Sequence, residues 1–494
     1  MSATPRPGAP GPGAPGPGAL PPGRSRHDLV AEVARALAAV PDGARVVVAL
    51  SGGPDSTALA YLLTDARPDL VPTLVHVRHG LRDDTEDLEV VRRHATWLGL
   101  PLLIREVEVT RRGHGIEAAA RAARYAALRE VATSVRARLI AVGHTAEDQA
   151  ETVLLRAARG TGTDGLAAMR PHHGGLVRPL LRLRRADVQR FVVLEGLPTV
   201  TDPTNRDPGV RRAVVRHEVL PALAPVAGDV VGALTRLAEL AAADADALEQ
   251  WAGQIVGEHA RWVGPVVAVE TRRLGRLPDA VAHRVLRRLV AEVAPSGPPL
   301  SAAALSELTT LQRGRAVDLP HGLRGTGAGG WVTLGPRALP TSEPVELAWP
   351  GATAWAPAGV QVRSLLPEPA AGQLALGVPG MWTPPREVGD AACTPPGGDA
   401  RRLRLVVGEL PGPLRLRHRA PGDRVVGTAG THRLSDVFVD LGVPRAVRAL
   451  WPVLVDARGR VVWVPGIVAD AEVLAAGRRA PAGLLVVERV GGHG

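Results

Sequence analysis

Two short stretches of the chain hold residue types that can bind an anion and a cation. Residues 51–56, SGGPDS, combine two glycines, two hydroxyls and one carboxylate. Glycines let the backbone approach a phosphate closely, hydroxyls donate hydrogen bonds to it, and Asp55 can hold Mg²⁺. Asp148 and Glu151 are three residues apart, which puts both carboxylates on one face of a helix. The SGGPDS stretch predicts a phosphate site, whereas the two acids taken alone are more typical of a helix start, where acids stabilise the helix dipole and face water.

The elements around these residues indicate a parallel sheet. Residues 46–50 form a short apolar run bounded by turn residues, which is typical of a buried parallel strand, and Pro54 suits the first turn of a helix. The same patterns predict further strands at 73–77, 102–109 and 139–142, and helices at 28–39, 83–98, 116–134 and 146–158. This alternation predicts an α/β fold with a doubly wound parallel sheet, whose ligands lie beyond the carboxyl ends of the strands.

Histidines and glycines follow the predicted strand ends. His76 and His79 lie at the end of the second strand, and Gly143 and His144 follow the fourth. Each histidine can be structural, held by backbone carbonyls, or can line the site. A zinc site made of the three histidines is less favoured, because positions at the strand ends explain them without metal.

The phosphate loop does not match the two commonest nucleotide-binding patterns. All 59 basic residues are arginines, so the lysine of a Walker loop is missing, and a Rossmann loop spaces its glycines differently. Residues 51–56 instead resemble the PP-loop of the ATP pyrophosphatases, which break ATP between its α and β phosphates. This resemblance implies that the loop grips the departing pyrophosphate.

Further motifs resemble one family of that superfamily. In chain order they are HVRHGLR at 76–82, GIEAAAR at 115–121 with RY at 124–125, GH at 143–144, DQAET at 148–152, RGTG at 159–162, RPLL at 178–181, DPTN at 202–205 and RHEVLP at 216–221. Together they resemble the tRNA(Ile)-lysidine synthetases over most of residues 44–221. The sequence departs from the family at Glu147, where aspartate is frequent, and at Ala213, where an asparagine commonly follows the arginine.

The resemblance implies a two-step reaction on the wobble cytidine of a tRNA(Ile) with a CAU anticodon. ATP and Mg²⁺ adenylate the base, and free L-lysine then displaces AMP to give lysidine. Catalytic roles are implied for Asp55, Asp148 and Glu151, with Mg²⁺ on Asp55. The implied ATP-binding residues are Ser51, Gly52, Gly53, Pro54, Asp55, Ser56, His76, His79, Arg124, Gly143 and His144. Candidate tRNA contacts are Arg159, Arg212, Arg216, Arg433, Arg445 and Arg448.

The chain divides by composition into five parts. Residues 1–26 form a Pro/Gly/Ala tail that is expected to be disordered, and residues 27–221 form the catalytic domain. Residues 222–335 are expected to be mainly helical and to select the tRNA, with helices at 226–259, 281–293 and 302–312 and a closing hairpin at 314–334. Residues 336–400 are interpreted as a linker with irregular strands. Residues 401–494, with APGDR at 420–424 and WVPG at 463–466, resemble the small α+β tRNA-binding domain of the family.

Charge and cysteine content limit the functions that the chain can have. A net charge of +10 and a pI of about 11.1 favour a polyanionic partner. The single Cys393 excludes a disulfide framework and argues against a PP-loop thiolation enzyme or a glutaminase-linked GMP or NAD synthetase. The single cysteine fits a reducing cytoplasm, where we expect the protein, and no apolar run reaches the ~18 residues of a membrane helix. Another PP-loop tRNA-modifying enzyme, a non-catalytic tRNA-binding protein switched by ATP, and a homodimer stay open.

Overall fold

The computed structural model describes most of the chain as two compact units, residues 1–246 and 247–494. The described residues are 23–78, 84–108, 116–200, 211–263, 265–295, 297, 300–311, 314–358, 360–366, 402–409, 412–427, 430–441, 443–480 and 482–489. His79, Cys393, most of the predicted N-terminal tail and the DPTN motif at 202–205 lie outside them.

The first unit contains the predicted parallel sheet. Its six strands run in the order β3-β2-β1-β4-β6-β5, with β5 alone antiparallel. The strands are β1 (Arg45–Ala49), β2 (Val71–Arg78), β3 (Leu102–Glu106), β4 (Leu139–Ala141), β5 (His172–His173) and β6 (Leu176–Val177). From β1 the chain adds β2 and then β3 on one side, and from β4 it adds the remaining strands on the other side. The carboxyl ends of β1 and β4 therefore flank the switch point, where ligands bind in such sheets.

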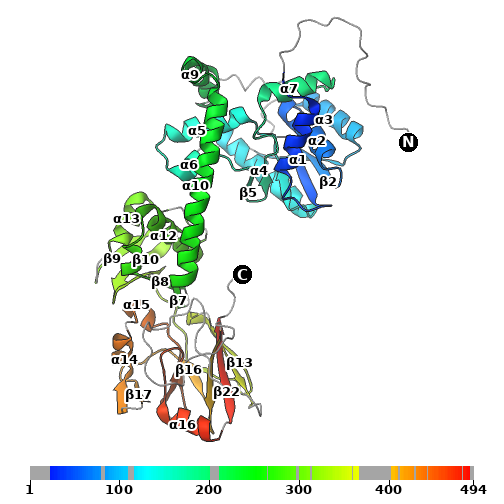
Figure 1. Ribbon diagram of the computed structural model, residues 1–494. Helices are drawn as coiled ribbons and strands as arrows, with labels where there is room; N and C mark the ends of the chain where they lie inside the picture. Colours follow the sequence, from blue (N-terminus) through cyan, green and yellow to red (C-terminus); the bar gives the residue numbers. More distant parts are fainter. Residues whose placement is uncertain are drawn as a thin grey trace, which may run out of the picture. The chain divides into compact units, whose positions relative to one another are not determined.

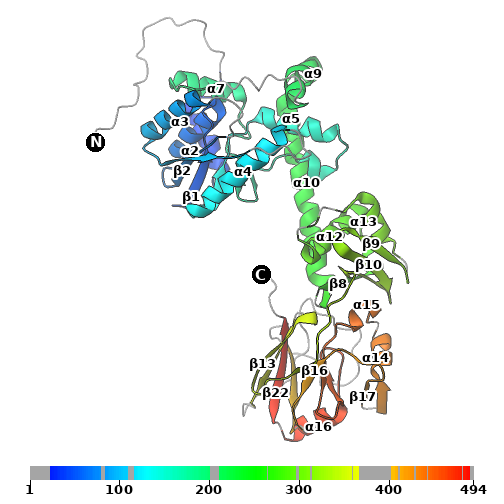
Figure 2. The same ribbon diagram turned by 180° about the vertical axis from the view of Figure 1, so that it is seen from behind.

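Helices cover both faces of this sheet (Figures 1 and 2). Val46 and Val48 of β1 point to the face covered by α1 (Arg26–Ala36), α2 (Pro54–Ala66), α3 (Thr85–Leu98) and α7 (Arg185–Leu194). Val47 points to the opposite face and packs against α4 (Ile116–Ser134). This alternation explains why the strand is apolar throughout, because both of its faces are buried.

A helical segment follows the sheet and packs on α5 (Ala146–Ala157). Ala146 and Ala150 of α5 share a buried cluster with residues of a π-helical turn and of α10. The segment comprises α8 (Arg211–Val214), the π-helical η2 (Val215–Val219), α9 (Leu220–Ala227) and α10 (Val230–His259). Within the described ranges no single helix is long and apolar enough to span a membrane, and residues 211–227 with α10, bent by 91°, meet those criteria by length and composition only.

The middle of the chain contains more β structure than expected. The prediction of helices alone after residue 221 is wrong at 261–270, where β7 (Arg261–Val263) and β8 (Val266–Glu270) form a hairpin. They join β9 (Ala316–Leu319), β10 (Leu323–Ala328) and β11 (Trp331–Pro336) in the order β7-β8-β11-β10-β9, and β10 and β11 form the predicted hairpin. The predicted helices are present as α12 (Asp279–Val293) and α13 (Ala302–Thr309), which pack on this sheet.

The C-terminal part consists of antiparallel sheets around one core. A four-stranded sheet has the order β13-β14-β22-β15, and a five-stranded sheet has the order β12-β16-β19-β20-β21. Strands from 345–365, which we interpreted as part of a linker, pair here with strands that follow residue 401. The bounds are β12 (Val345–Glu346), β13 (Gly351–Trp355), β14 (Val360–Leu365), β15 (Arg402–Val407), β16 (Arg415–Arg417), β17 (Arg424–Gly427), β18 (Gly430–Arg433), α14 (Leu434–Asp440), α15 (Arg445–Arg448), β19 (Val453–Val455), β20 (Val461–Val464), β21 (Val468–Ala469), α16 (Ala471–Arg479) and β22 (Gly483–Arg489).

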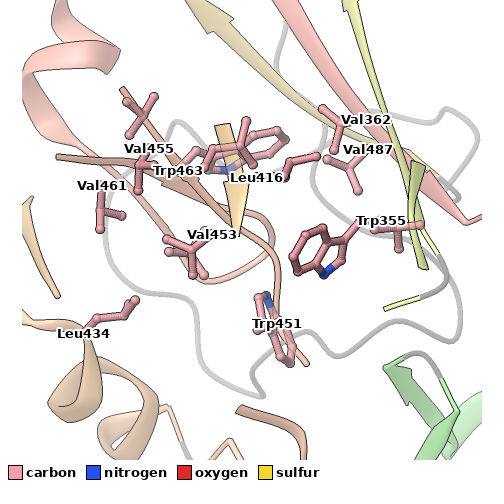
Figure 3. Packing of buried hydrophobic residues seen from close by; sticks show 14 of the residues in the cluster. Trp355, Val362, Leu416, Leu434, Trp451, Val453, Val455, Val461, Trp463 and Val487 are labelled. Atoms are coloured by element: carbon pink, nitrogen blue, oxygen red, sulfur yellow. The ribbon is translucent and has the colours of Figure 1, made fainter. Parts of the chain in front are cut away.

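Tryptophans fill the core of these sheets (Figure 3). Trp355 and Trp451 are fully buried, and the indole of Trp451 donates a hydrogen bond to Pro465 O at 2.9 Å. The ring of Phe438 lies 5.9 Å from that of Trp451, edge to face. Phe438 and Trp451 therefore belong to the core, as the sequence predicts, and neither is exposed for stacking on a base.

Candidate functional site

The loop after β1 is shaped by two serines and a glycine with positive φ. Ser56 Oγ lies 3.0 Å from Ser51 Oγ and donates to Gly53 O at 3.0 Å, while the Ser51 amide donates to Ser56 Oγ at 3.1 Å. Gly52 has a φ of 86°, a conformation that favours glycine. No side chain of the described residues caps the N-terminus of α2. The amides and the positive dipole end of α2 are thus available to an anion, as a phosphate site requires.

Gly143 brings the end of β4 against the first turn of α2. A Cβ atom at Gly143 would lie 2.9 Å from the carbonyl oxygen of Asp55 and 3.0 Å from its carbonyl carbon. Only glycine allows this approach of two backbones. The contact places His144 and the start of α5 beside the phosphate loop.

Asp55 presents a carboxylate oxygen without a partner at this loop. Its Oδ2 lies 3.3 Å from Arg185 Nε, whereas its buried Oδ1 has no hydrogen-bond partner among the described residues. Burial raises the pKa of Asp55 to about 6, against the opposing effect of Arg185. The bare Oδ1 fits Mg²⁺, which proteins bind through one or two carboxylates plus substrate phosphates. The described residues contain no group of three acidic, histidine or cysteine side chains that could hold a metal by themselves.

Asp148 and Glu151 are both buried, with 8% and 0% of their surface exposed. This excludes the alternative that they face water at the helix start. Asp148 Oδ2 accepts hydrogen bonds from the amide of Thr145 at 2.9 Å and from its hydroxyl at 3.1 Å, which caps α5. Burial opposes the ionisation of Asp148, but Arg185 at 3.1 Å and the Thr145 amide outweigh it and lower the pKa of this carboxyl.

Arg212 and Arg216, two of the predicted tRNA contacts, form ion pairs with Glu151. Arg216 Nε is 2.6 Å from Glu151 Oε1 and Arg216 Nη2 is 3.1 Å from Oε2, while Arg212 Nε is 3.1 Å from Oε2. Arg216 belongs to the π-helical turn η2, an irregularity often found at functional sites. Both arginines compensate the buried charge of Glu151, and their contact with RNA stays a prediction.

Arg185 joins the three predicted catalytic carboxylates, and we did not identify it from the sequence. Its guanidinium lies 3.3 Å from Asp55, 3.1 Å from Asp148 and 3.8 Å from Glu151. Arg185 is the first residue of α7, which packs on α2 within the same core. One cation therefore contacts both the phosphate loop and the pair of acids on α5.

Glu147, one of the two departures from the family, holds α7 in place. Its Oε2 accepts a hydrogen bond from the Arg185 amide at 2.7 Å, and its Oε1 accepts one from Arg184 Nε at 2.9 Å. Glu147 thus fastens the start of α7 to the start of α5. Ala213, the other departure, is buried in α8.

His76 is buried and His144 is half-buried, and both lie near the strand ends. His76 Nδ1 lies 2.9 Å from Leu50 O and therefore donates to it, which leaves Nε2 buried without a partner among the described residues. Burial lowers the pKa of His76. Burial also lowers the pKa of His144 to about 3, although Asp148 opposes this, and His144 Nδ1 has no described partner.

Two other predicted site residues of the first unit, Arg124 and Arg159, lie on its surface. Arg124 lies on an exposed part of α4 with its guanidinium 5.8 Å from the ring of Tyr125, and Arg159 is exposed beyond the end of α5. Their contacts with ATP and tRNA stay predictions.

Of the predicted tRNA contacts in the second unit, Arg445 and Arg448 belong to α15, and Arg433 is the last residue of β18. Arg448 Nε donates to Val443 O at 2.8 Å. Burial lowers the pKa of Arg448, and the neighbouring charges of Arg419 and Arg445 lower it further. Arg433 and Arg445 are exposed. This concentration of positive charge suits a polyanion.

Comparisons with known proteins agree with this architecture. Residues 26–223 match the family model of the PP-loop domain, and residues 414–485 match that of the TilS substrate C-terminal domain. The tRNA(Ile)-lysidine synthase of Symbiobacterium thermophilum is 36% identical over 465 residues, covering 87% of this chain and 90% of the relative. The enzyme of the same name from Geobacillus kaustophilus is 31% identical over 461 residues, covering 90% and 92%. That from Thermobifida fusca is 43% identical over 302 residues, covering 59% and 92%. The chain therefore belongs to the tRNA(Ile)-lysidine synthase family, and it is a ligase with an ATP-binding PP-loop domain.

Proposed function

We propose that this chain ligates free L-lysine to carbon 2 of the wobble cytidine in a CAU-anticodon tRNA(Ile), releasing AMP and pyrophosphate. The observation that carries the proposal is the meeting of Asp55 at the phosphate loop with the buried pair Asp148 and Glu151, all three within 4 Å of Arg185. A site for a nucleotide phosphate thereby adjoins a site for an ammonium group. We also propose that the reaction takes place in the cytoplasm.

In the first step, the oxygen on carbon 2 of cytidine attacks the α-phosphate, and the bond between the α and β phosphates breaks. Pyrophosphate leaves with the electron pair, so negative charge grows at the uncapped N-terminus of α2, where backbone amides are available to it. Asp55 would hold Mg²⁺, which neutralises phosphate charge when bound. The loop therefore stabilises the leaving group.

In the second step, the side-chain nitrogen of lysine attacks carbon 2, and the bond from that carbon to the AMP oxygen breaks. The ammonium of lysine has a reference pKa of about 10.4, so it must lose a proton before it attacks. Asp148 and Glu151 attract the ammonium, and a carboxylate next to the nitrogen can accept that proton.

Incubation of the chain with ATP, radiolabelled lysine and CAU-anticodon tRNA(Ile) tests the proposal. We expect label to enter the RNA, with one AMP formed per lysine. Elongator methionine tRNA, which shares the anticodon, is the control and should stay unlabelled. Binding of tRNA with ATP turnover but without label in the RNA would instead support an ATP-switched binding protein.

A further inference from the structure

Arg185 occupies the place that the ammonium of lysine needs. Its guanidinium lies 3.1 Å from Asp148 Oδ1 and 3.8 Å from Glu151 Oε1, so both predicted lysine-binding acids are neutralised from within the chain. Arg212 and Arg216 approach Glu151 as well, and Arg216 also lies 3.6 Å from Asp148 Oδ1. An ammonium that donates hydrogen bonds to these oxygens would lie beside the Arg185 guanidinium and would be repelled by it. Movement of Arg185 away from the acids would therefore favour lysine binding.

The same guanidinium also lies at the phosphate loop. Arg185 Nε is 3.3 Å from Asp55 Oδ2, and Asp55 is in the first turn of α2, whose N-terminus is open to an anion. A triphosphate bound there brings several negative charges within reach of this side chain. Arginine binds phosphate strongly, through a planar fork of donors that matches its oxygens.

The backbone of Arg185 is fixed, so only its side chain has to move. The Arg185 amide donates to Glu147 Oε2 at 2.7 Å, and the Ala146 amide donates to Leu183 O at 2.9 Å, which locks the starts of α5 and α7 together. Arg184 strengthens this anchor through Glu147. A long side chain on a fixed backbone can exchange partners by rotamer changes alone.

We propose that Arg185 couples the two substrates: it guards Asp148 and Glu151 in the empty site, and it turns to the phosphates when ATP binds, which opens the acids to lysine. The inference rests on the proposed function, because it assumes that ATP and lysine are the substrates. Each substrate then binds more tightly in the presence of the other. This coupling lowers the affinity for lysine when no nucleotide is bound.

Calorimetric titration of lysine into the wild-type chain measures this coupling without catalysis. Titrations are compared in the absence and in the presence of a saturating non-hydrolysable ATP analogue with Mg²⁺. We expect the analogue to lower the Kd of lysine at least about 5-fold, the lower end of typical coupling between sites. Reciprocity requires that lysine lower the Kd of the analogue by the same factor.

The variant Arg185→Gln removes the guard and keeps hydrogen-bonding atoms at the position. Without nucleotide, we expect it to bind lysine at least about 5-fold more tightly than the wild type. The analogue should bind it more weakly, and should no longer change its affinity for lysine. The matched control is Arg182→Gln in the same segment, because Arg182 forms an exposed ion pair with Glu239 away from the acids. The control should keep the wild-type coupling.

Two results would overturn the inference. One is a wild-type Kd for lysine that does not depend on the analogue, a measurement that needs no variant to fold. The other is weaker lysine binding by a folded Arg185→Gln chain without nucleotide, which would make Arg185 part of the lysine site and not its competitor. Either result can occur while labelled lysine still enters tRNA, so failure of the coupling is distinguishable from failure of the proposed function.

Discussion

Glu151 is the most enclosed carboxylate of the site and the one with the most arginine neighbours. We expect Glu151→Gln, which keeps the shape and removes the charge, to lower lysine incorporation about 100-fold or more, as for loss of a general base. Exchange of pyrophosphate into ATP in the presence of tRNA should fall far less, because Glu151 does not contact the phosphate loop. Equal losses in the two assays would contradict its assignment to lysine. Circular dichroism checks that the uncompensated arginines do not unfold the chain.

Asp55 is expected to be needed for activity and, when it is ionised, to lower the stability of the fold. Its folded pKa of about 6 lies above the ordinary 3.8, so its contribution to stability is present below pH 3.8 and is lost as pH rises through 6. We expect Asp55→Asn to abolish pyrophosphate exchange, yet to unfold at a higher temperature than the wild type at pH 8, with a gain of at most about 3 kcal/mol. At pH 4 the two melting temperatures should converge. A lower melting temperature of the variant at pH 8 would contradict the raised pKa.

The sequence singles out the three acids that meet in the candidate site, but not the arginine that lies between them. Asp55 and the pair on α5 follow from local patterns, namely a glycine turn after an apolar strand and a helical spacing of three. Arg185 has no such pattern. Its place depends on the docking of α7 against α2 and on the reach of Glu147, which are tertiary contacts.

Helix α2 and strand β4 approach each other through glycine alone. We expect Gly143→Ala to shift the first turn of α2, because the new Cβ would meet backbone atoms of Asp55 at 2.9–3.0 Å, and backbone cannot rotate away as a side chain can. Pyrophosphate exchange should fall at least about 10-fold, since misplaced binding groups lose rate steeply. Gly257→Ala in α10 is the matched control, because a Cβ there meets nothing within 4 Å. Unchanged exchange by Gly143→Ala would show that the contact is tolerant.

His94 ties α3 to α2 and to the segment after α7. Its Nε2 donates to Pro198 O at 2.8 Å, so its Nδ1 accepts from the hydroxyl of Tyr61 at 3.1 Å, and burial lowers its pKa below 6.5. A lowered folded pKa means that this stabilisation is complete above pH 6.5 and is lost as pH falls toward the folded pKa. His94→Gln should reduce the loss of stability on acidification by up to about 1.4 kcal/mol per pH unit. Hydrogen exchange of the α2 and α3 amides, corrected for intrinsic rates, measures this local stability at each pH. If its pH dependence is the same in the variant and the wild type, His94 is not the group responsible.

The sequence predicts helices and strands well where consecutive residues are apolar and buried throughout. Strands β1 to β4 and helix α4 lie where their apolar patterns place them, whereas the short parallel strand β6 was not predicted. Strands β7 and β8 were missed because they are short, lie between helices and gain their stability by pairing with β11, which comes much later in the chain. Local propensity does not reveal such a partner.

For the whole molecule, the arginines near α15 predict how tRNA binding responds to salt. Each phosphate contact contributes about −0.9 to the slope of log affinity against log salt on duplex nucleic acid. We expect the double variant Arg445→Gln, Arg448→Gln to make the slope for tRNA less steep by one to two units. Arg458→Gln, a change at another exposed arginine of the same part, is the control. A slope that does not change would exclude these two side chains as phosphate contacts.

The position of β22 has a consequence for the growing chain. This strand lies between β14 and β15, and pairs with both, although it is made after both. On the ribosome, β14 and β15 therefore emerge with open hydrogen-bonding edges and wait for a partner that is still to be synthesised. Open edges invite pairing with other chains, and distant pairing is slow. This sheet can therefore be completed only after β22 has been synthesised, and until then the nascent chain is exposed to pairing with other chains.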